Sequence, residues 1–174
     1  MAANNEKILI VSATSRNNLV LAKRLSEFLD GHTDVEIVNL EDYELPLFKP
    51  GIECDPETIA ELIERFQGAS GFIFCAPEYN GGVPPILSNA LTWITNFTEN
   101  WRDAFSGKVA LIATHSAGQA FRFLSTFRNQ LEYLGTIVMP RTITIVGNQS
   151  LDDDSVKRVI SGFTRILNNK KELD

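Results

Sequence analysis

The sequence predicts an α/β fold of three layers, in which a parallel five-stranded sheet with strand order 2-1-3-4-5 lies between two layers of helices. The first observation is that strand-like apolar runs alternate with amphipathic helical patterns five times along the 174 residues, which is typical of a doubly wound sheet. The second is that the runs at 7–11, 70–75 and 108–114 are apolar on both faces, as expected of central parallel strands. The third is that the run at 35–40 alternates and is more polar, which places it at an edge. Five strands fit this order better than the six-strand dinucleotide-binding order.

Local signals in the sequence mark where the elements begin and end. Gly31 follows the first helical pattern as a cap, and Gly68 and Gly135 end the second and fourth. Asp55-Pro56 begins the second helix, with proline at its first position, and Pro140 interrupts the last strand region. The expected strands are 7–11, 35–40, 70–75, 108–114 and a last region at 137–139 and 142–146, and the expected helices are 19–29, 56–66, 85–97, 121–134 and 152–171. No linker or internal repeat separates these elements, so residues 1–174 are expected to form a single domain.

Composition and charge exclude several classes of function. The chain is 44% hydrophobic and 22% charged, and its net charge of −6 with a pI of about 5 disfavours non-specific binding to nucleic acid. No apolar run approaches the roughly 18 residues of a membrane span, and the first residues do not have the layout of a signal peptide. Cys54 and Cys75 are expected to be reduced thiols of a cytoplasmic protein. We therefore expect no nucleic-acid partner and no membrane association.

The stretch from Ala76 to Pro85 is the most informative part of the chain. It joins the buried run 71–75 to a helical pattern, and therefore lies at the carboxyl edge of the predicted sheet, where such folds bind ligands. Its glycines allow the backbone to approach a flat ligand closely, and its prolines restrict its freedom. The stretch is either a rigid turn, with Glu78 solvated and Tyr79 packed, or a loop whose backbone N–H groups donate to such a ligand.

A polar loop at residues 12–18 follows the first strand and opens at the same edge of the sheet. Its hydroxyl groups, the Arg16 guanidinium and the free N–H groups of a helix start suit a phosphate. A capped strand-to-helix turn is the alternative that the same residues allow.

A third loop, at 115–120, follows the fourth strand. Together with the preceding residue it reads Thr-His-Ser-Ala-Gly, one residue away from the Gly-x-Ser-x-Gly nucleophile elbow of α/β-hydrolases. In that fold the triad histidine follows the serine, whereas His32 and His115 both precede Ser116. His115 is also the direct neighbour of the serine, which is a poor geometry for a base. A hydrolase is therefore not expected.

Two further groups of residues have a structural interpretation. The acidic run 152–154 is expected to begin the last helix, where it matches the helix dipole, and no metal site is expected. Phe123 and Phe127 share a helical face and are expected in the core. Trp101 and Phe105 are expected to form an apolar subunit interface.

Three parts of the sequence resemble one family. The stretch 77–84 reads Pro-Glu-Tyr-Asn-Gly-Gly-Val-Pro and resembles the flavin-ring loop of the NAD(P)H-dependent FMN reductases, a flavodoxin-like family. The likeness continues through the Asn-Ala-Leu-x-Trp run at 89–93. In the loop at 12–18, Thr14 and Arg16 match the family's hydroxyl and arginine, but the loop is shorter than usual and lacks a glycine and the second serine. In the loop at 115–120, Ser-x-Gly matches and Gln-Ala replaces a Gly-Gly pair.

The resemblance implies a flavodoxin-like three-layer sandwich that binds FMN non-covalently, with NADPH or NADH as co-substrate. It assigns the phosphate to Thr14, Ser15, Arg16 and Asn18. It assigns the ring to Pro77, Glu78, Tyr79, Asn80 and Gly81 and to Ser116, Ala117 and Gly118. NAD(P)H would pass a hydride to FMN, and a quinone, azo compound, flavin or metal ion would then take the electrons. No side chain is assigned as a catalytic acid or base.

The resemblance also implies a homo-oligomer, either a dimer or a tetramer. The alternative is a non-enzymatic function, as a flavodoxin-like electron carrier or as a module that binds flavin or a protein partner. The shortened first loop and the missing Gly-Gly pair leave room for that alternative.

Overall fold

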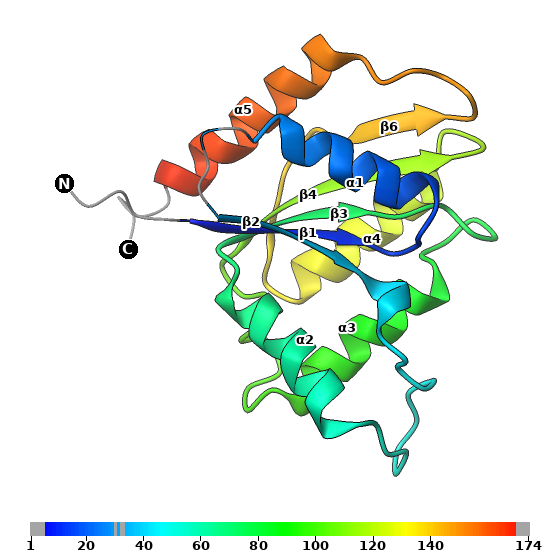
Figure 1. The fold of residues 1–174 in the computed structure, drawn as a ribbon, viewed down its shortest axis with the longest axis vertical. Helices are drawn as coiled ribbons and strands as arrows, with labels where there is room; N and C mark the ends of the chain where they lie inside the picture. The colour runs from blue at the N-terminus through cyan, green and yellow to red at the C-terminus, as the bar shows by residue number, and fades with distance from the viewer. Residues whose placement is uncertain (1–5, 30, 32–33, 170–174) are drawn as a thin grey trace.

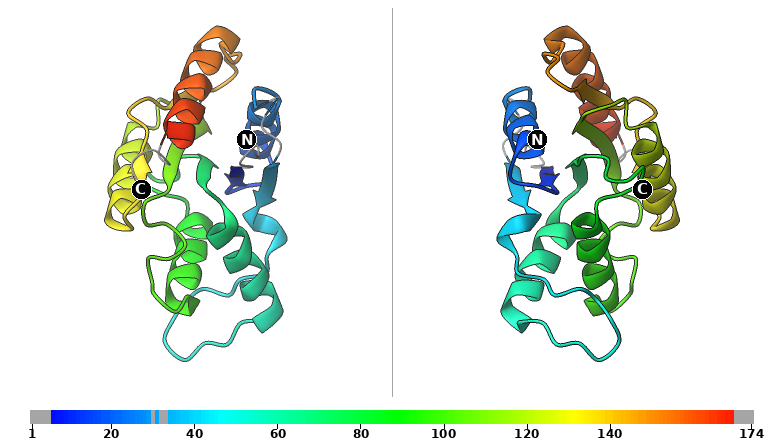
Figure 2. Two further views of the ribbon diagram at one scale, coloured as in Figure 1. Left: turned by 90° about the vertical axis from the view of Figure 1, so that its left-hand side faces the viewer. Right: turned by 90° about the vertical axis from the view of Figure 1, so that its right-hand side faces the viewer.

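A parallel sheet forms the middle layer of the molecule, and helices cover both of its faces. The computed structural model describes residues 6–29, 31 and 34–169. Helices α1 (Asn17–Glu27) and α5 (Asp153–Asn169) lie on one face, and α2 (Pro56–Gly68), α3 (Pro85–Phe97) and α4 (Phe121–Tyr133) lie on the other (Figure 1). Figure 2 shows the two helix layers on opposite sides of the sheet.

The sheet has the order β2-β1-β3-β4-β5, and each pair of neighbouring strands is parallel. Its strands are β1 (Lys7–Ser12), β2 (Asp34–Asn39), β3 (Gly71–Cys75), β4 (Val109–Ser116), β5 (Ile137–Val138) and β6 (Ile143–Val146). β5 and β6 both pair with β4, at its beginning and at its end, so they share the fifth position. Pro140 lies between them. It interrupts the strand because proline has no N–H group to donate to a sheet. The predicted α/β class and strand order are confirmed.

Alternate side chains of the central strands pack into two separate cores. In β1, Ile8 and Ile10 face α1 and α5, whereas Leu9 and Val11 face the other three helices. All four are fully buried, which is why this run is apolar on both faces. The two cysteines are free thiols, and Cys75 is buried at the end of β3.

An aromatic cluster fills the core between the sheet and α2. Phe105 is 0% exposed, and its ring centroid lies 5.7 Å from that of Phe66 and 5.9 Å from that of Phe72. The expectation that Phe105 forms part of a subunit interface is therefore wrong, because the turn before β4 folds its ring into the core. Trp101 remains 40% exposed and packs against Tyr133 in a tilted arrangement, at a centroid distance of 5.5 Å.

The helices on the second face begin and pack as the sequence predicts. Asp55 caps α2, since its Oδ2 accepts a hydrogen bond of 2.9 Å from the N–H of Thr58, and Pro56 occupies the first helical position. Phe123 and Phe127 of α4 are fully buried and stacked on each other. Within the described ranges, no helix combines the length and the apolar character that crossing a membrane requires.

Helix α1 differs in its bounds from the prediction. It begins at Asn17 instead of Leu19, because the Arg16 carbonyl accepts the first hydrogen bonds of the helix. It ends at Glu27, and Gly31, with φ +96°, lies in the turn beyond it. His32 and the end of the predicted last helix, residues 170–171, lie outside the described residues.

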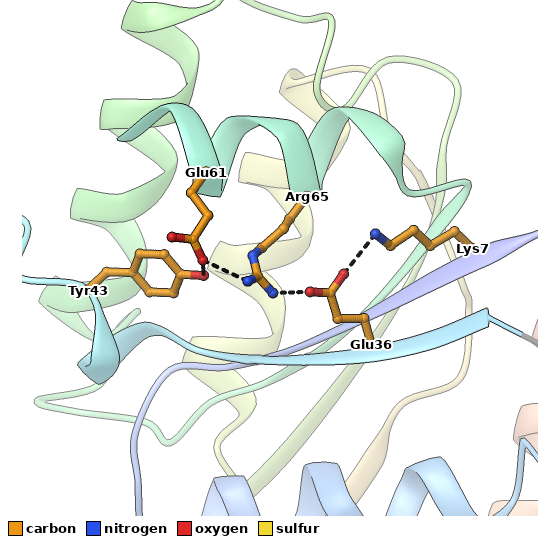
Figure 3. A network of polar contacts seen from close by, with 5 residues as sticks. All are labelled: Lys7, Glu36, Tyr43, Glu61 and Arg65. Atoms are coloured by element: carbon orange, nitrogen blue, oxygen red, sulfur yellow. Dashed lines mark hydrogen bonds and ion pairs between the residues drawn. The ribbon is translucent and has the colours of Figure 1, made fainter. Parts of the chain in front are cut away.

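A network of charges holds the polar edge strand β2 against its neighbours (Figure 3). Glu36 of β2 pairs with Lys7 of β1 at 2.8 Å and with Arg65 of α2. Arg65 also contacts Glu61 at 2.6 Å, and the Tyr43 hydroxyl donates to the same carboxylate at 3.4 Å. Burial, together with the charge of Glu61, raises the pKa of Tyr43 to about 12. These pairs explain why an edge strand with acidic residues packs beneath a helix.

Candidate functional site

Four loops at the carboxyl edge of the sheet enclose a cavity of about 520 Å³. They follow β1, β3, β4 and β6. The cavity is lined by Thr14, Arg16, Asn17, Asn18, Pro77, Glu78, Tyr79, His115, Ser116, Ala117, Gly147 and Asn148. A second hollow of about 550 Å³ lies between β2 and α2, away from these loops, and its lining is mostly polar and charged. The first cavity lies where open α/β sheets bind ligands, and its size suits a small molecule.

The cavity brings together residues from all three loops that the sequence singles out. The predicted residues that line it are Thr14, Arg16, Asn18, Pro77, Glu78, Tyr79, Ser116 and Ala117, whereas Ser15, Asn80, Gly81 and Gly118 do not. Sequence reasoning missed Asn17, His115, Gly147 and Asn148. A signal for the last two was present, because they follow a parallel strand and therefore open at the same edge as the other loops.

The start of α1 offers donors to a negatively charged group. Arg16 occupies the N-cap position without a side-chain cap, and the first turn contains no acidic residue. Within the described residues, the N–H groups of Arg16, Asn17 and Asn18 have no hydrogen-bond partner. The Arg16 guanidinium is exposed and forms no ion pair there, and Thr14 is 7% exposed beside it. Free N–H groups, a hydroxyl and a guanidinium at a helix N-terminus are groups that suit an anion.

Ser15 is turned away from the cavity and holds the loop to the end of β2. Its N–H donates to Glu41 Oε2 at 2.8 Å, and its hydroxyl accepts a hydrogen bond of 2.9 Å from Asn39 Nδ2. The Ser15 hydroxyl and N–H, with the charge of Arg16, hold the pKa of Glu41 below its ordinary value. Ser15 therefore fixes the shape of the first loop.

Asn18 joins the first loop to the third. Its Nδ2 donates to the His115 carbonyl at 3.0 Å, and its Oδ1 accepts from the His115 N–H at 2.9 Å. The side chain is buried, with 2% of Asn18 exposed. The His115 ring continues the chain of contacts, because its Nε2 lies 2.7 Å from the carbonyl oxygen of Gly147. Since a carbonyl only accepts, Nε2 carries the hydrogen. Loops far apart in the sequence are thus fastened to one another.

The loop after β3 forms a tight hairpin. The N–H groups of Tyr79 and Gly82 each donate to the other residue's carbonyl, at 3.2 and 3.0 Å. Asn80 and Gly81, at the tip, have φ values of +51° and +69°, which is the backbone of a type I′ turn and explains the Asn-Gly pair. Among the described residues, nothing accepts from the N–H groups of these two tip residues. They remain available to a ligand.

Glu78 precedes this hairpin and is not a solvated side chain. Its N–H donates to Ser116 Oγ at 2.8 Å, and its Oε2 accepts from the N–H of Phe123 at 2.9 Å. Tyr79 is 50% exposed and is not packed. The rigid turn with a solvated Glu78 and a packed Tyr79 is therefore not what the chain forms.

The Asn-Ala-Leu-x-Trp run has a structural role at some distance from the cavity. Asn89 accepts from the N–H of Phe48 at 2.8 Å and donates to the Pro46 carbonyl at 3.0 Å. Trp93 Nε1 donates to the same carbonyl at 2.7 Å. These bonds hold the loop before α2 against α3.

Comparisons with known proteins identify the family and the fold. The sequence model of the family described as NADPH-dependent FMN reductase matches residues 7–150. A quinone reductase of Pseudomonas putida is 30% identical over 145 residues, which are 80% of this chain and 76% of the relative. The structure of the flavoenzyme NAD(P)H:(acceptor) oxidoreductase FerB from Paracoccus denitrificans is similar, with a TM-score of 0.76 and 21% identity, over 96% of this chain and 98% of that one. A flavodoxin from the domain Archaea has a TM-score of 0.67 and 12% identity, over 93% and 99%. These two structures show that the fold is flavodoxin-like, as predicted.

Proposed function

This chain belongs to the NADPH-dependent FMN reductase family, and from that premise we propose that the cavity holds FMN and that the protein reduces a small-molecule acceptor. The observation that carries the proposal is that one cavity is lined both by the uncapped start of α1 and by Pro77, Glu78 and Tyr79, which lead into a glycine-containing hairpin. The first suits a phosphate, and the second suits the polar edge of a flat ring. FMN held there would supply the redox chemistry that links NAD(P)H to the acceptor.

The first loop would hold the phosphate. Thr14 supplies a hydroxyl, Arg16 supplies a guanidinium, and the N–H groups at the start of α1 supply further donors. Ser15 and Asn18, which the sequence also assigns to the phosphate, have polar groups bonded to Glu41, Asn39 and the His115 backbone. We propose that they contribute by holding this loop in place.

The second and third loops would hold the ring. Asn80 and Gly81 do not line the cavity but directly follow Tyr79, which does, and their unbonded N–H groups would donate to a ring that extends to the hairpin tip. Pro77 limits the mobility of the loop that carries them. The turn from Ser116 to Gly118 adjoins this loop, since the Ser116 hydroxyl oxygen accepts a hydrogen bond from the Glu78 N–H. A half-exposed Tyr79 at the rim offers a flat surface to a second substrate.

We propose a quinone as acceptor, with azo compounds, free flavins and metal ions as further candidates. The name of the Pseudomonas putida relative supports the first of these. A planar quinone also suits the aromatic rim formed by Tyr79. The expected homo-oligomer is likewise a proposal, and light scattering of the purified protein tests it.

Arg16→Ala tests the assignment of the phosphate. A hydrogen bond to a charged group contributes about 1.5–3 kcal/mol, so the FMN dissociation constant is expected to rise about 10- to 150-fold. Quenching of FMN fluorescence measures it, and circular dichroism checks that the fold is retained. Arg158→Ala, at an exposed arginine of α5, is the matched control and is expected to bind FMN as the wild type does. Equal affinity of the two variants would refute the assignment.

A further inference from the structure

Helix α4 begins without a cap of its own. Its N-cap residue, Ala120, has a left-handed backbone (φ +54°, ψ +30°) and no side-chain oxygen. The first hydrogen bond of the helix runs from the Leu124 N–H to the Ala120 carbonyl at 2.9 Å. The three preceding N–H groups therefore need partners from elsewhere.

Glu78 supplies one of these partners from another loop. Its Oε2 accepts at 2.9 Å from the N–H of Phe123, the third residue of α4 and one of the groups that an N-cap side chain ordinarily satisfies. A carboxylate at this end of a helix is also stabilised by the helix dipole. Glu78 thus caps a helix that begins 43 residues later, at Phe121.

The backbone of Glu78 is fixed at the same time. Its N–H donates to Ser116 Oγ at 2.8 Å, and this hydroxyl lies 2.9 Å from Thr114 Oγ1, both at the end of β4. The next residue, Tyr79, enters the hairpin whose tip carries the free N–H groups. One residue therefore ties the hairpin both to the sheet and to α4.

We infer that Glu78 is a positioning residue, whose carboxylate clamps the hairpin to α4 so that the N–H groups of Asn80 and Gly81 meet the FMN ring. The inference rests on the proposed function, because it deepens the role of the hairpin in that site. The carboxylate acts through the Phe123 N–H and makes no contact with the ligand. The neutral amide of glutamine, which also accepts a hydrogen bond, is expected to replace it.

The test compares Glu78→Ala, Glu78→Gln and Glu78→Asp. Glu99→Ala is the control, since Glu99 is exposed and its side chain forms no hydrogen bond or ion pair among the described residues. Two quantities are measured: the FMN dissociation constant by fluorescence quenching, and amide hydrogen exchange of the FMN-free protein at Phe123 and residues 79–82. E78A is expected to bind FMN about tenfold more weakly, equivalent to about 1.4 kcal/mol, and to exchange faster at these amides. E78Q and E99A are expected to remain close to the wild type.

The aspartate variant distinguishes the effect of side-chain length from the effect of charge. E78D keeps the negative charge but withdraws the oxygen from α4, so it is expected to weaken FMN binding as E78A does, and it replaces E78A if that variant does not fold. E78Q binding as weakly as E78A would overturn the inference, because the charge would then act on FMN directly. Unchanged exchange of the Phe123 amide in both E78A and E78D would also overturn it. If the wild type binds no FMN, the proposed function is refuted. Hydrogen exchange at Phe123 still tests whether the Glu78 carboxylate holds the hairpin to α4.

Discussion

Replacing Asn18 with alanine is expected to destabilise the protein far more than the same change at Asn17. Asn18 is 2% exposed, and its amide makes two hydrogen bonds, of 2.9 and 3.0 Å, to the N–H and carbonyl of His115. Asn17, one residue earlier on the same helix, is exposed, and its side chain has no hydrogen bond within the described residues. Comparing the two alanine variants therefore measures what the hydrogen bonds between the first and third loops contribute to stability.

The magnitude follows from the two lost bonds. Each contributes about 1 kcal/mol net, and each backbone group of His115 left unpaired adds up to about 1 kcal/mol more, since the neighbouring cavity admits water. Asn18→Ala is thus expected to lower the free energy of unfolding by about 2–4 kcal/mol. For a domain of this size that corresponds to a fall in Tm of about 4–16 °C. Asn17→Ala is expected to change the free energy of unfolding by less than about 0.5 kcal/mol.

Thermal unfolding of the FMN-free protein, followed by circular dichroism, measures both variants. Asn18→Asp sharpens the result. Its carboxylate still accepts from the His115 N–H but opposes the His115 carbonyl, which favours the protonated acid in the folded state and raises its folded pKa. The stability of the variant then falls as pH rises through that pKa. Asn18→Asp is therefore expected to lower the free energy of unfolding more at pH 7 than at pH 4. If both alanine variants lowered the free energy of unfolding by the same small amount, Asn18 would not stabilise the contact between the first and third loops.

Two further predictions concern the core and the edge of the first loop. Phe105→Ala is expected to lower the free energy of unfolding, measured in urea, by about 3–5 kcal/mol, because the ring is buried in the aromatic cluster. The oligomeric state, measured by light scattering, is expected to stay unchanged. A changed oligomeric state would indicate that Phe105 contributes to a subunit interface. Glu41 has a lowered folded pKa, so its stabilising contribution is present above its unfolded pKa and is lost as pH falls through the folded one. Glu41→Gln is therefore expected to lower stability at pH 7, by less than about 1 kcal/mol, and to match the wild type near pH 3; an equal loss at both would contradict the role of its charge.

The sheet could be predicted from the sequence because a strand that is buried on both faces has an apolar run of residues. The apolar run of β1 and the more polar run of β2 place one strand in the middle and the other at the edge. Pro140 marks the break between β5 and β6 for an equally local reason. Phe105 could not be placed in this way, because residues 98–108 have no periodic pattern, and the turn geometry alone decides that its ring enters the core.

Part of the candidate site depends on contacts that no local pattern specifies. The bonds between Asn18 and His115 join residues 97 positions apart, and the Ser15–Glu41 bond joins the first loop to the segment after β2. Sequence spacing suggests that such polar residues meet a phosphate, but the neighbouring loops decide which of their atoms remain free. Gly147 and Asn148 are different, since the parallel order of the sheet already placed the loop after β6 at the same edge.

The visible absorption spectrum of the purified protein shows whether the cavity holds FMN and whether a nicotinamide reduces it. FMN is titrated in first, and NADH or NADPH is then added without oxygen. We expect a yellow protein that retains FMN through gel filtration and bleaches rapidly when a nicotinamide is added. A protein that stays colourless at high FMN would contradict the proposed cavity. Bound FMN that neither nicotinamide reduces would contradict the proposed reaction.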